Sequence, residues 1–438
     1  MQGQNRLFYG WFMVAGAFFV MSVAYAIWYA FPIFYIPILD EFKWSRAETA
    51  SIISVGFIIY GVGSLIGGIL LDKFGPRVLF TAATIILTIG LVGCSRATTL
   101  WHLYFWWGGF VAFGVSTVGF IPCNTLVTRW FIRKRGAALG IAQAGGRESF
   151  MTTPLVQILI MTIGWRSTLL VLAGVGFIVI IGIAQFLRNS PEDLGLFPDG
   201  DSPIEGDDEK TKLKQDHLIL DKEWAAIDWT LSRGLRHYRL WALVGSSFAL
   251  GFAVSIALTH QIAYMVDIGF SALIASFLLV IFGIVSVAGR FMGFLSDRYG
   301  REPIYFVGCC GMAIGLMLLA LASRSPSIWI LSIYITLFGF FSGLNGPTFM
   351  SGAADVFQGK NLGGILGFTN IGYGIGNALG AWFGGYAFDE LGGYGIAFII
   401  AIIGTGIAPI LFRIVSPGKI RLVSKKANVL KSKKVYSK

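Results

Sequence analysis

The chain has 438 residues, of which 55% are hydrophobic and 13% are charged, and 57 are glycines. This composition is typical of a protein that crosses a membrane many times, and it excludes an ordinary soluble globular domain. The formal net charge of +11 is high enough to suggest nucleic-acid binding. However, the basic residues gather between apolar segments, where they report membrane topology, so we expect no nucleic-acid partner. The four cysteines show no metal-ligand spacing, and we predict no metal site and no cofactor.

The apolar segments predict an all-α fold of twelve membrane-spanning helices in two six-helix halves. We expect the first half over 1–190, a linker with an amphipathic helix over 191–238, the second half over 239–415, and a basic tail over 416–438. In this arrangement most lysines and arginines lie on the side of the membrane that holds both termini. The positive-inside rule then places the termini and the linker in the cytoplasm.

Two spans of the first half carry candidate ligand-binding residues. The first span, about 9–37, is rich in aromatic residues, among them Tyr29, and is interrupted by prolines. It could line a pocket for a small organic ligand, or its rings could form an interfacial belt and core packing. The fourth span, about 101–128, places Asn124 on one face with Thr117 and Phe120. Asn124 could present its amide to a cavity or bond a neighbouring helix.

A loop signature follows the second span and is repeated after the eighth span, 225 residues later. The first copy comprises Gly68, Asp72, Lys73, Gly75 and Arg77, and the second comprises Gly293, Asp297, Arg298, Gly300 and Arg301. A motif that recurs half a chain apart indicates two homologous halves. We expect the two aspartates to hold helix ends and to bias a conformational equilibrium without touching a substrate.

The fifth span contains two adjacent charges, Arg147 and Glu148. They lie roughly 18 Å along the helix from Arg135, at about 1.5 Å per residue, which places them near the middle of the membrane. Gly140 and Ala144 share their face of the helix. The stripe could line a cavity, or the two charges could form a structural ion pair.

The eighth span contains Arg290, seven residues before Asp297 and so roughly 10 Å from the end of its helix. A buried arginine costs a few kcal/mol, and such residues normally face a bundle interior or a wet cavity. Gly283 and Ser286 lie on the same face, which is therefore small and polar. We predict a substrate-binding role, with a structural salt bridge as the alternative.

Two further spans of the second half contribute candidates. His260 lies near the outer end of the seventh span, in a run that also contains Tyr264, Asp267 and Gly269, and a lone histidine near an interface is often structural. Asn370 lies on a glycine-rich stripe of the eleventh span, about 362–386, and Tyr373 lies beside this stripe. We predict that both residues contribute to the substrate site.

These motifs resemble those of the major facilitator superfamily, whose members carry G-x-L-x-D-[RK]-x-G-x-[RK] between the second and third spans of each half. The resemblance covers nearly all of the chain. The runs Asp40-Glu41-Phe42-Lys43-Trp44-Ser45-Arg46 and Trp130-Phe131-Ile132-Arg133-Lys134-Arg135-Gly136 are similar to those of the monocarboxylate and oxalate/formate transporter branch. One departure is Ser149, which replaces the last glycine of the family's fifth-span motif directly after Arg147 and Glu148.

The resemblance implies a secondary transporter whose fifth and eighth spans face each other, so that Arg147, Glu148 and Arg290 lie near one cavity. Arginine binds a carboxylate through two parallel hydrogen bonds, which favours a small organic anion as substrate. We therefore expect symport of a monocarboxylate such as lactate, pyruvate or formate with a proton, which Glu148 couples. The run from His260 to Gly269 also resembles one in family members, and this resemblance implies a gate or proton role for His260. The sequence contains no motif of a soluble catalytic site, so we predict no enzyme activity.

Two alternatives remain open. Oxalate-like dicarboxylate exchangers resemble this chain in the arginine of the eighth span but pair it with a lysine in the eleventh span, which is absent here; Arg147 could substitute for that lysine. A membrane sensor that binds an anion without moving it is a further alternative. In either case we expect a monomeric protein of the cell membrane whose partners are a small organic anion, protons and the lipid bilayer.

Overall fold

The computed structural model describes residues 8–44, 46–148, 152–200, 219–359 and 361–422. Within these ranges the regular structure is helical, apart from one isolated antiparallel bridge between Ile219 and Arg421. Nine stretches among the described residues are long and apolar enough to cross a membrane. One of them, Val55–Ser95, has 41 residues and contains two crossings. The helices are consistent with the predicted all-α membrane fold.

The first half contains six crossings. In chain order they are built from α1 (Tyr9–Tyr29) with α2 (Phe31–Phe42), the two arms of α3 (Arg46–Ser95), α4 (Leu100–Leu103) with the π-helix η1 (Tyr104–Val111), α5 (Ala112–Val118) and α6 (Phe120–Trp130), α7 (Arg135–Glu148) with α8 (Thr153–Ile163), and α9 (Trp165–Phe186). The arms of α3 meet at Gly75, whose φ of 74° and ψ of 174° are not helical. Glycine adopts this positive φ without strain, and Pro76 then begins the next arm with a φ already suited to a helix.

The second half repeats this plan. Its crossings are α13 (Tyr238–Asp267), α14 (Ala272–Phe291) with α15 (Phe294–Tyr299), α16 (Arg301–Leu321), α17 (Ile328–Val356), α18 (Leu362–Leu391) and α19 (Gly395–Val415). The turn between α15 and α16 contains Gly300, which has a φ of 112° and corresponds to Gly75 in the first half. The two halves therefore change direction at the same point of the repeated loop signature.

The segments outside the crossings are short. They comprise η3 (Pro191–Leu194), η4 (Pro198–Gly200), α11 (Lys222–Ala225), α12 (Leu231–Leu235) and α20 (Pro417–Ile420). After η3 and η4, the described part of the linker contains two short α-helices, α11 and α12, where the sequence predicts one amphipathic helix. The break has a local cause, because Asp221 caps the first turn and Thr230 starts a second turn through its own side-chain cap.

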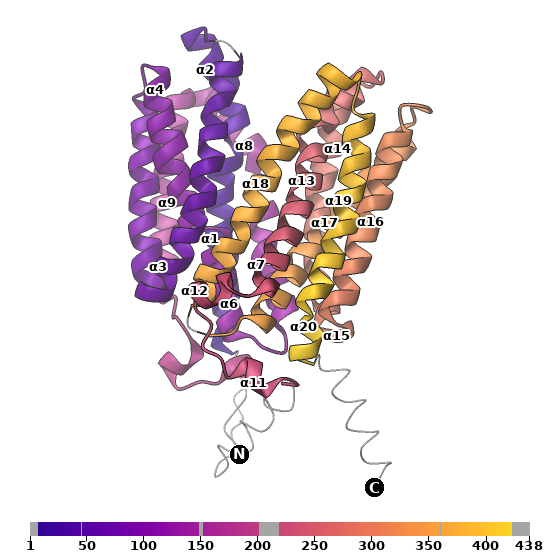
Figure 1. Ribbon diagram of the computed structural model, residues 1–438. Helices are drawn as coiled ribbons and strands as arrows, with labels where there is room; N and C mark the ends of the chain where they lie inside the picture. Colours follow the sequence, from indigo (N-terminus) through magenta and orange to yellow (C-terminus); the bar gives the residue numbers. More distant parts are fainter. Residues whose placement is uncertain (1–7, 45, 149–151, 201–218, 360, 423–438) are drawn as a thin grey trace, which may run out of the picture.

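The two halves meet at one end of the bundle and diverge toward the other end (Figure 1). We call the first end the basic end; it contains both loop signatures together with α11, α12 and α20. Helices of opposite halves pack as two sets, α3 against α18, and α7 against α14, α15 and α17. The pairing of α7 with α14 brings Gly140 and Arg290 into contact and positions the candidate site.

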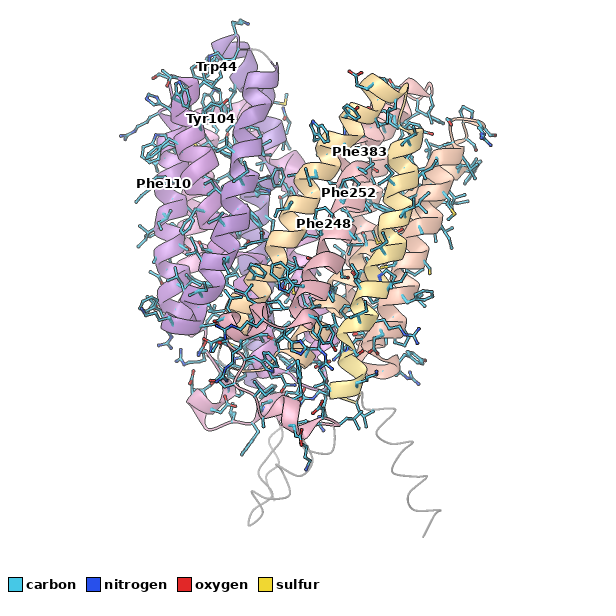
Figure 2. The ribbon with its side chains drawn as sticks, in the orientation of Figure 1. Trp44, Tyr104, Phe110, Phe248, Phe252 and Phe383 are labelled. Atoms are coloured by element: carbon cyan, nitrogen blue, oxygen red, sulfur yellow. The ribbon has the colours of Figure 1, made fainter. Side chains whose placement is uncertain are left out.

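Large apolar side chains cover the outer surfaces of both halves (Figure 2). Trp101, Ile178 and Trp329 are each more than 70% exposed. Inside the second half, rings such as Phe252 and Phe383 pack against each other with centroids 5.9 Å apart. A protein in water would not expose so much contiguous apolar surface, whereas a bilayer solvates it.

Candidate functional site

Arg290 lies in the last turn of α14, buried between the two halves with only 7% of its surface exposed. Its Nη1 donates a hydrogen bond of 2.9 Å to Oε1 of Gln143 on α7. The helices approach closely here because position 140 is a glycine: a Cβ there would lie 2.1 Å from the carbonyl oxygen of Arg290. The guanidinium of the second half is thus oriented by an amide of the first half.

Gln143 continues this contact deeper into the first half. Its Nε2 donates to Oδ1 of Asn124 at 2.8 Å, and Nδ2 of Asn124 donates to the carbonyl oxygen of Phe120 at 2.6 Å. Gln143 and Asn124 are completely buried. The chain of hydrogen bonds from Arg290 through Gln143 to Asn124, which we call the amide relay, therefore spans the interface between the halves.

Gln143 is not among the site residues predicted from the sequence. It is neutral, so it lacks the charge that draws attention to Arg147, four residues further along the same helical face. A usable signal was present: Gln143 is the one side chain able to form strong hydrogen bonds between Gly140 and Gly146, in a segment otherwise made of small and apolar residues.

A group of tyrosines lies about one helical turn along α7 from the amide relay. The hydroxyl oxygens of Tyr25 and Tyr60 are 2.6 Å apart, and the ring of Tyr29 stacks on Tyr25 with centroids 5.7 Å apart. A Cβ at Gly146, three residues after Gln143, would lie 3.2 Å from the Tyr25 ring. Rings and hydroxyls from α1 and α3 therefore lie beside the relay on the first-half side.

The predicted residues of α18 lie opposite this tyrosine group. Asn370 is buried and Tyr373 is half-buried. A Cβ at Gly374 would lie 4.0 Å from the Cα atom of Gly61, so Tyr373 and Tyr60 are at the same level of α18 and α3. The structure thus brings the predicted residues of α1, α6, α14 and α18 to the interface between the halves.

The structure does not bring the other three predicted residues, Arg147, Glu148 and His260, into this group. Arg147 and Glu148 form the last two positions of α7, but their side chains lie outside the described part of the structure. His260 lies between α13 and α18, where its Nε2 donates to the carbonyl oxygen of Ala381 at 2.8 Å. A Cβ at Gly384 would lie 2.3 Å from the His260 ring, so this histidine is packed within the second half, away from α7.

The aspartates of the two loop signatures each reach a helix of the opposite half. Asp72 accepts hydrogen bonds from the backbone N–H groups of Gly363 and Gly364 at 3.1 and 2.9 Å, at the start of α18. Asp297 accepts from the N–H groups of Gly136 and Ala137, both at 2.9 Å, at the start of α7. Both carboxylates are therefore N-terminal caps across the interface, where a negative charge also suits the helix dipole.

Glycines of the same signatures allow the backbones to meet. A Cβ at Gly68 would lie 2.1 Å from the carbonyl oxygen of Gly363, and a Cβ at Gly136 would lie 2.4 Å from that of Gly293. No side chain fits at these distances. The basic end is consequently closed by backbone contact as well as by the two caps.

The cations of the signatures have several different partners. Arg77 donates from Nε to the carbonyl oxygen of Leu187 at 3.1 Å, while Lys73 and Arg298 lie over the neighbouring rings of Phe74 and Tyr299. Arg301 is buried and bonds Asp297 and Ser296. Arg77 and Arg301, the last residues of the two signatures, thus bond to different partners, although they occupy similar places in the motif.

Arg301 belongs to a buried ion cluster that the sequence analysis did not predict. Asp355, at the end of α17, pairs with Nε of Arg301 at 2.9 Å and with Nη1 of Arg135, from the first half, at 2.5 Å. Arg421 is buried nearby, and burial lowers the pKa of its guanidinium to about 10. The Arg135–Asp355 pair adds a third polar link between the halves at the basic end.

The architecture agrees with comparisons to known proteins. The Major Facilitator Superfamily family model matches residues 15–293 and 287–436. Monocarboxylate transporter 13 of Rattus norvegicus is 27% identical over 401 residues, covering 90% of this chain and 86% of the relative. Monocarboxylate transporter 12 of Homo sapiens is 24% identical over 403 residues, covering 90% and 77%.

Among solved structures, the chain is similar to the major facilitator superfamily proton:xylose symporter XylE bound to 6-bromo-6-deoxy-D-glucose. The TM-score is 0.68 at 15% sequence identity, and the similarity covers 96% of this chain and 99% of that chain. This likeness confirms the twelve-helix fold predicted from the sequence. The chain belongs to the major facilitator superfamily and is an integral membrane transporter related to the monocarboxylate transporters.

Proposed function

We propose that the protein transports a small monocarboxylate together with a proton by alternating access, and that Arg290 anchors the carboxylate. The observation that carries the proposal is the position of Arg290, buried at the interface of the halves and hydrogen-bonded to Gln143 across it. A transporter that rocks its halves around a central site needs its binding groups at this interface. Arg290 meets that requirement.

The chemistry of the guanidinium supports an anionic substrate. Its N–H donors match a carboxylate through two parallel hydrogen bonds, which an ammonium group cannot form. The bond to Gln143 fixes the plane of the guanidinium, and Asn124 in turn fixes Gln143. A group held in this way loses little conformational entropy when the substrate binds.

The tyrosine group and the predicted residues of α18 would surround the rest of the substrate. Tyr29 contributes a ring, the Tyr25–Tyr60 pair contributes hydroxyls, and Tyr373 and Asn370 approach from the other half. Ligand sites of this kind combine apolar walls with a few polar groups that set orientation. A short carboxylate with a small polar or apolar tail suits such walls.

Proton coupling is assigned to Glu148. With Glu148 ionised, the charges of Arg147, Glu148 and Arg290 sum to +1, which compensates one monoanion; protonation raises the sum to +2. Proton and anion would then favour each other's binding. His260 is the second candidate, but its hydrogen bond to Ala381 and its packing against Gly384 suit a structural role in the second half.

The closed basic end fits one state of the transport cycle. The caps made by Asp72 and Asp297 and the Arg135–Asp355 pair must all break before the halves can separate there. We place this end in the cytoplasm on the basis of its lysines and arginines, so the structure corresponds to the state open to the outside. We further propose that the protein is a monomer in the cell membrane and that both of its termini lie in the cytoplasm.

Counterflow in proteoliposomes tests this function. Vesicles preloaded with unlabelled lactate, formate or oxalate would be diluted into the labelled compound, and accumulation of label identifies the substrate. We expect accumulation with a monocarboxylate, stimulation by an inward proton gradient, and loss of both in Arg290→Ala but not in Arg413→Ala, an exposed arginine at the end of α19. Accumulation with oxalate alone would indicate dicarboxylate exchange, and binding without accumulation would indicate a sensor.

A further inference from the structure

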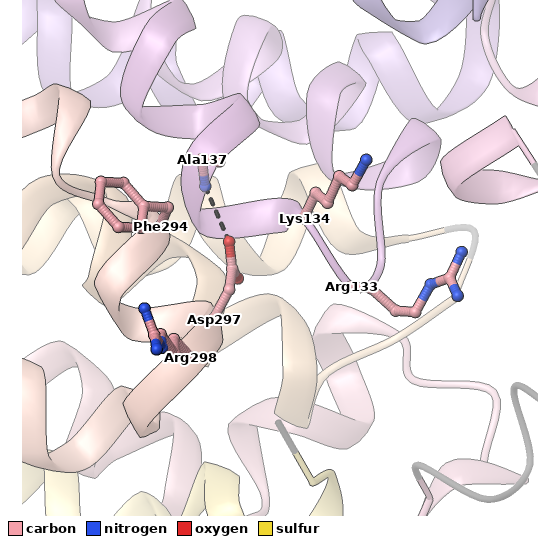
Figure 3. A pocket seen from close by; sticks show the side chains of 6 residues that line it. All are labelled: Arg133, Lys134, Ala137, Phe294, Asp297 and Arg298. Carbon is pink, nitrogen blue, oxygen red and sulfur yellow. Dashed lines mark hydrogen bonds between the residues drawn. The ribbon is translucent and has the colours of Figure 1, made fainter. Parts of the chain in front are cut away.

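A hollow of about 610 Å³ opens at the basic end, on the seam between the two halves (Figure 3). The first half lines it with Arg133, Lys134 and Ala137, at the start of α7, and the second half lines it with three residues of α15, namely Phe294, Asp297 and Arg298. The lining is thus shared between two bodies that must separate during transport.

The charge in this hollow is unbalanced. Its single carboxylate, Asp297, already accepts from Gly136, Ala137 and Arg301. Lys134 and Arg298 are exposed, and within the described part of the chain neither forms an ion pair. An anion that enters the hollow would therefore meet two cations, one from each half, that no resident carboxylate compensates.

On the side of the hollow formed by α15, Phe294 provides an apolar patch beside Asp297 and Arg298, and this patch continues onto the outer surface of the protein. Phe294 is 42% exposed, and Phe291, one turn away at the end of α14, is 46% exposed. Both belong to a helix stretch long and apolar enough to cross a membrane. A ligand of this hollow could consequently place an acidic headgroup among the cations and hydrocarbon against the phenylalanines.

We propose that this hollow binds the headgroup of an anionic phospholipid, and that the bound lipid stabilises the closed basic end. Basic pockets between membrane helices are suited to such headgroups, whose phosphate pairs with lysine and arginine. The lipid spans Lys134 and Arg298 only while the halves are together, so its binding energy favours the closed state over the state in which the seam has opened. The proposal goes beyond substrate transport, and its test is independent of the substrate.

Native mass spectrometry of the delipidated, detergent-solubilised full chain, titrated with phosphatidylglycerol and in parallel with phosphatidylcholine, tests the proposal. We expect tight binding of phosphatidylglycerol that the double variant Lys134→Gln/Arg298→Gln weakens roughly thirtyfold, on the basis of two surface cations. The matched control Arg413→Gln/Lys419→Gln also removes two exposed cations from the basic end and should change the affinity less than about twofold.

Two further measurements separate the possible explanations of a change in lipid binding. The charge-conserving variant Lys134→Arg/Arg298→Lys should retain the lipid, which separates loss of charge from loss of folding. Inorganic phosphate in excess should not replace the lipid, because it brings no hydrocarbon to Phe294. Equal affinity of the wild type and the double glutamine variant for phosphatidylglycerol would overturn the proposal, as would complete displacement of the lipid by phosphate.

Discussion

Asp72 and Asp297 make the same contact in opposite directions: each caps the first turn of a helix in the other half, α18 for Asp72 and α7 for Asp297. The repeated loop signature thus becomes a pair of symmetric links across the interface. Additional bonds hold the two carboxylates in place, since Arg129 pairs with Asp72 at 2.6 Å and Arg301 pairs with Asp297.

The first prediction concerns these links. In Asp72→Asn the cap keeps an acceptor but loses its charge, which costs the closed state about 1 kcal/mol, or roughly fivefold in population. Asp72 does not reach the substrate, so equilibrium binding should change less than the transport rate. Parallel measurement of counterflow and of substrate binding checks this. Loss of binding in a folded variant would show that Asp72 belongs to the substrate site.

Backbone contact at the seam leads to the second prediction. In Gly136→Ala the new methyl group would meet the carbonyl oxygen of Gly293, and overpacking of this kind costs about 1–3 kcal/mol. The closed basic end should become less populated, by roughly fivefold to a hundredfold. Gly174→Ala in α9 is the control, because a Cβ there meets nothing within 4 Å.

Accessibility of a cysteine introduced at the seam measures this change, since it reports opening of the basic end directly. A reactive cysteine at position 137 should label faster in Gly136→Ala than in Gly174→Ala. Equal labelling rates would contradict the view that the close approach of Gly136 and Gly293 limits opening.

The third prediction tests Glu148 as the proton carrier. In Glu148→Gln the side chain resembles the protonated acid and can no longer titrate, so exchange of anion for anion should persist while uptake driven by a pH gradient fails. Both fluxes can be followed in the same proteoliposomes. If gradient-driven uptake survives, the proton travels through another group, with His260 as the next to replace, or the protein exchanges anions without protons.

The linker provides a prediction about pH and stability. Nδ1 of His237 accepts from the N–H of Arg239 at 3.2 Å, and its ring packs on Trp224 with centroids 4.7 Å apart. Burial, and secondarily the charge of Arg239, lower the pKa of His237 below its usual 6.5. Folding therefore favours the neutral ring, and this contribution to stability, complete above pH 6.5, disappears as the pH falls through the lowered pKa.

Thermal unfolding of the solubilised protein between pH 7.5 and 5 measures this contribution. We expect the wild type to lose more stability on acidification than His237→Asn, which keeps an acceptor but does not titrate. Identical pH profiles for the wild type and His237→Asn would rule out this role for His237.

Local patterns in the sequence were sufficient to predict the fold. Twelve apolar segments and a repeated loop signature predicted two six-helix halves, because hydrophobic length and turn chemistry are local properties. The same signature singled out Asp72 and Asp297. Which helix each carboxylate caps depends on how the two halves pack, and no local pattern carries that information.

The parts of the site that escaped prediction are those whose meaning depends on a distant partner. Gln143 is unremarkable until Arg290 and Asn124 lie on either side of it. Asp355 lies at the end of α17, where a negative charge opposes the helix dipole, and its pairing with Arg135 and Arg301 explains its presence there. Side-chain charge and spacing identified Arg290 from the sequence, whereas the neutral amides and the long-range ion pairs could be identified only from the folded structure.

Equilibrium binding to Arg290→Lys tests whether Arg290 anchors the carboxylate of the substrate. Lysine keeps the positive charge but cannot form the two parallel bonds, and loss of one charged hydrogen bond, about 1.5–3 kcal/mol, weakens binding roughly tenfold to a hundredfold. Titration of the purified protein with the monocarboxylate identified by counterflow gives the affinity, with Arg413→Lys as the matched control. We expect at least a tenfold loss of affinity in Arg290→Lys and none in Arg413→Lys; wild-type affinity in a folded Arg290→Lys protein would show that Arg290 does not anchor the carboxylate.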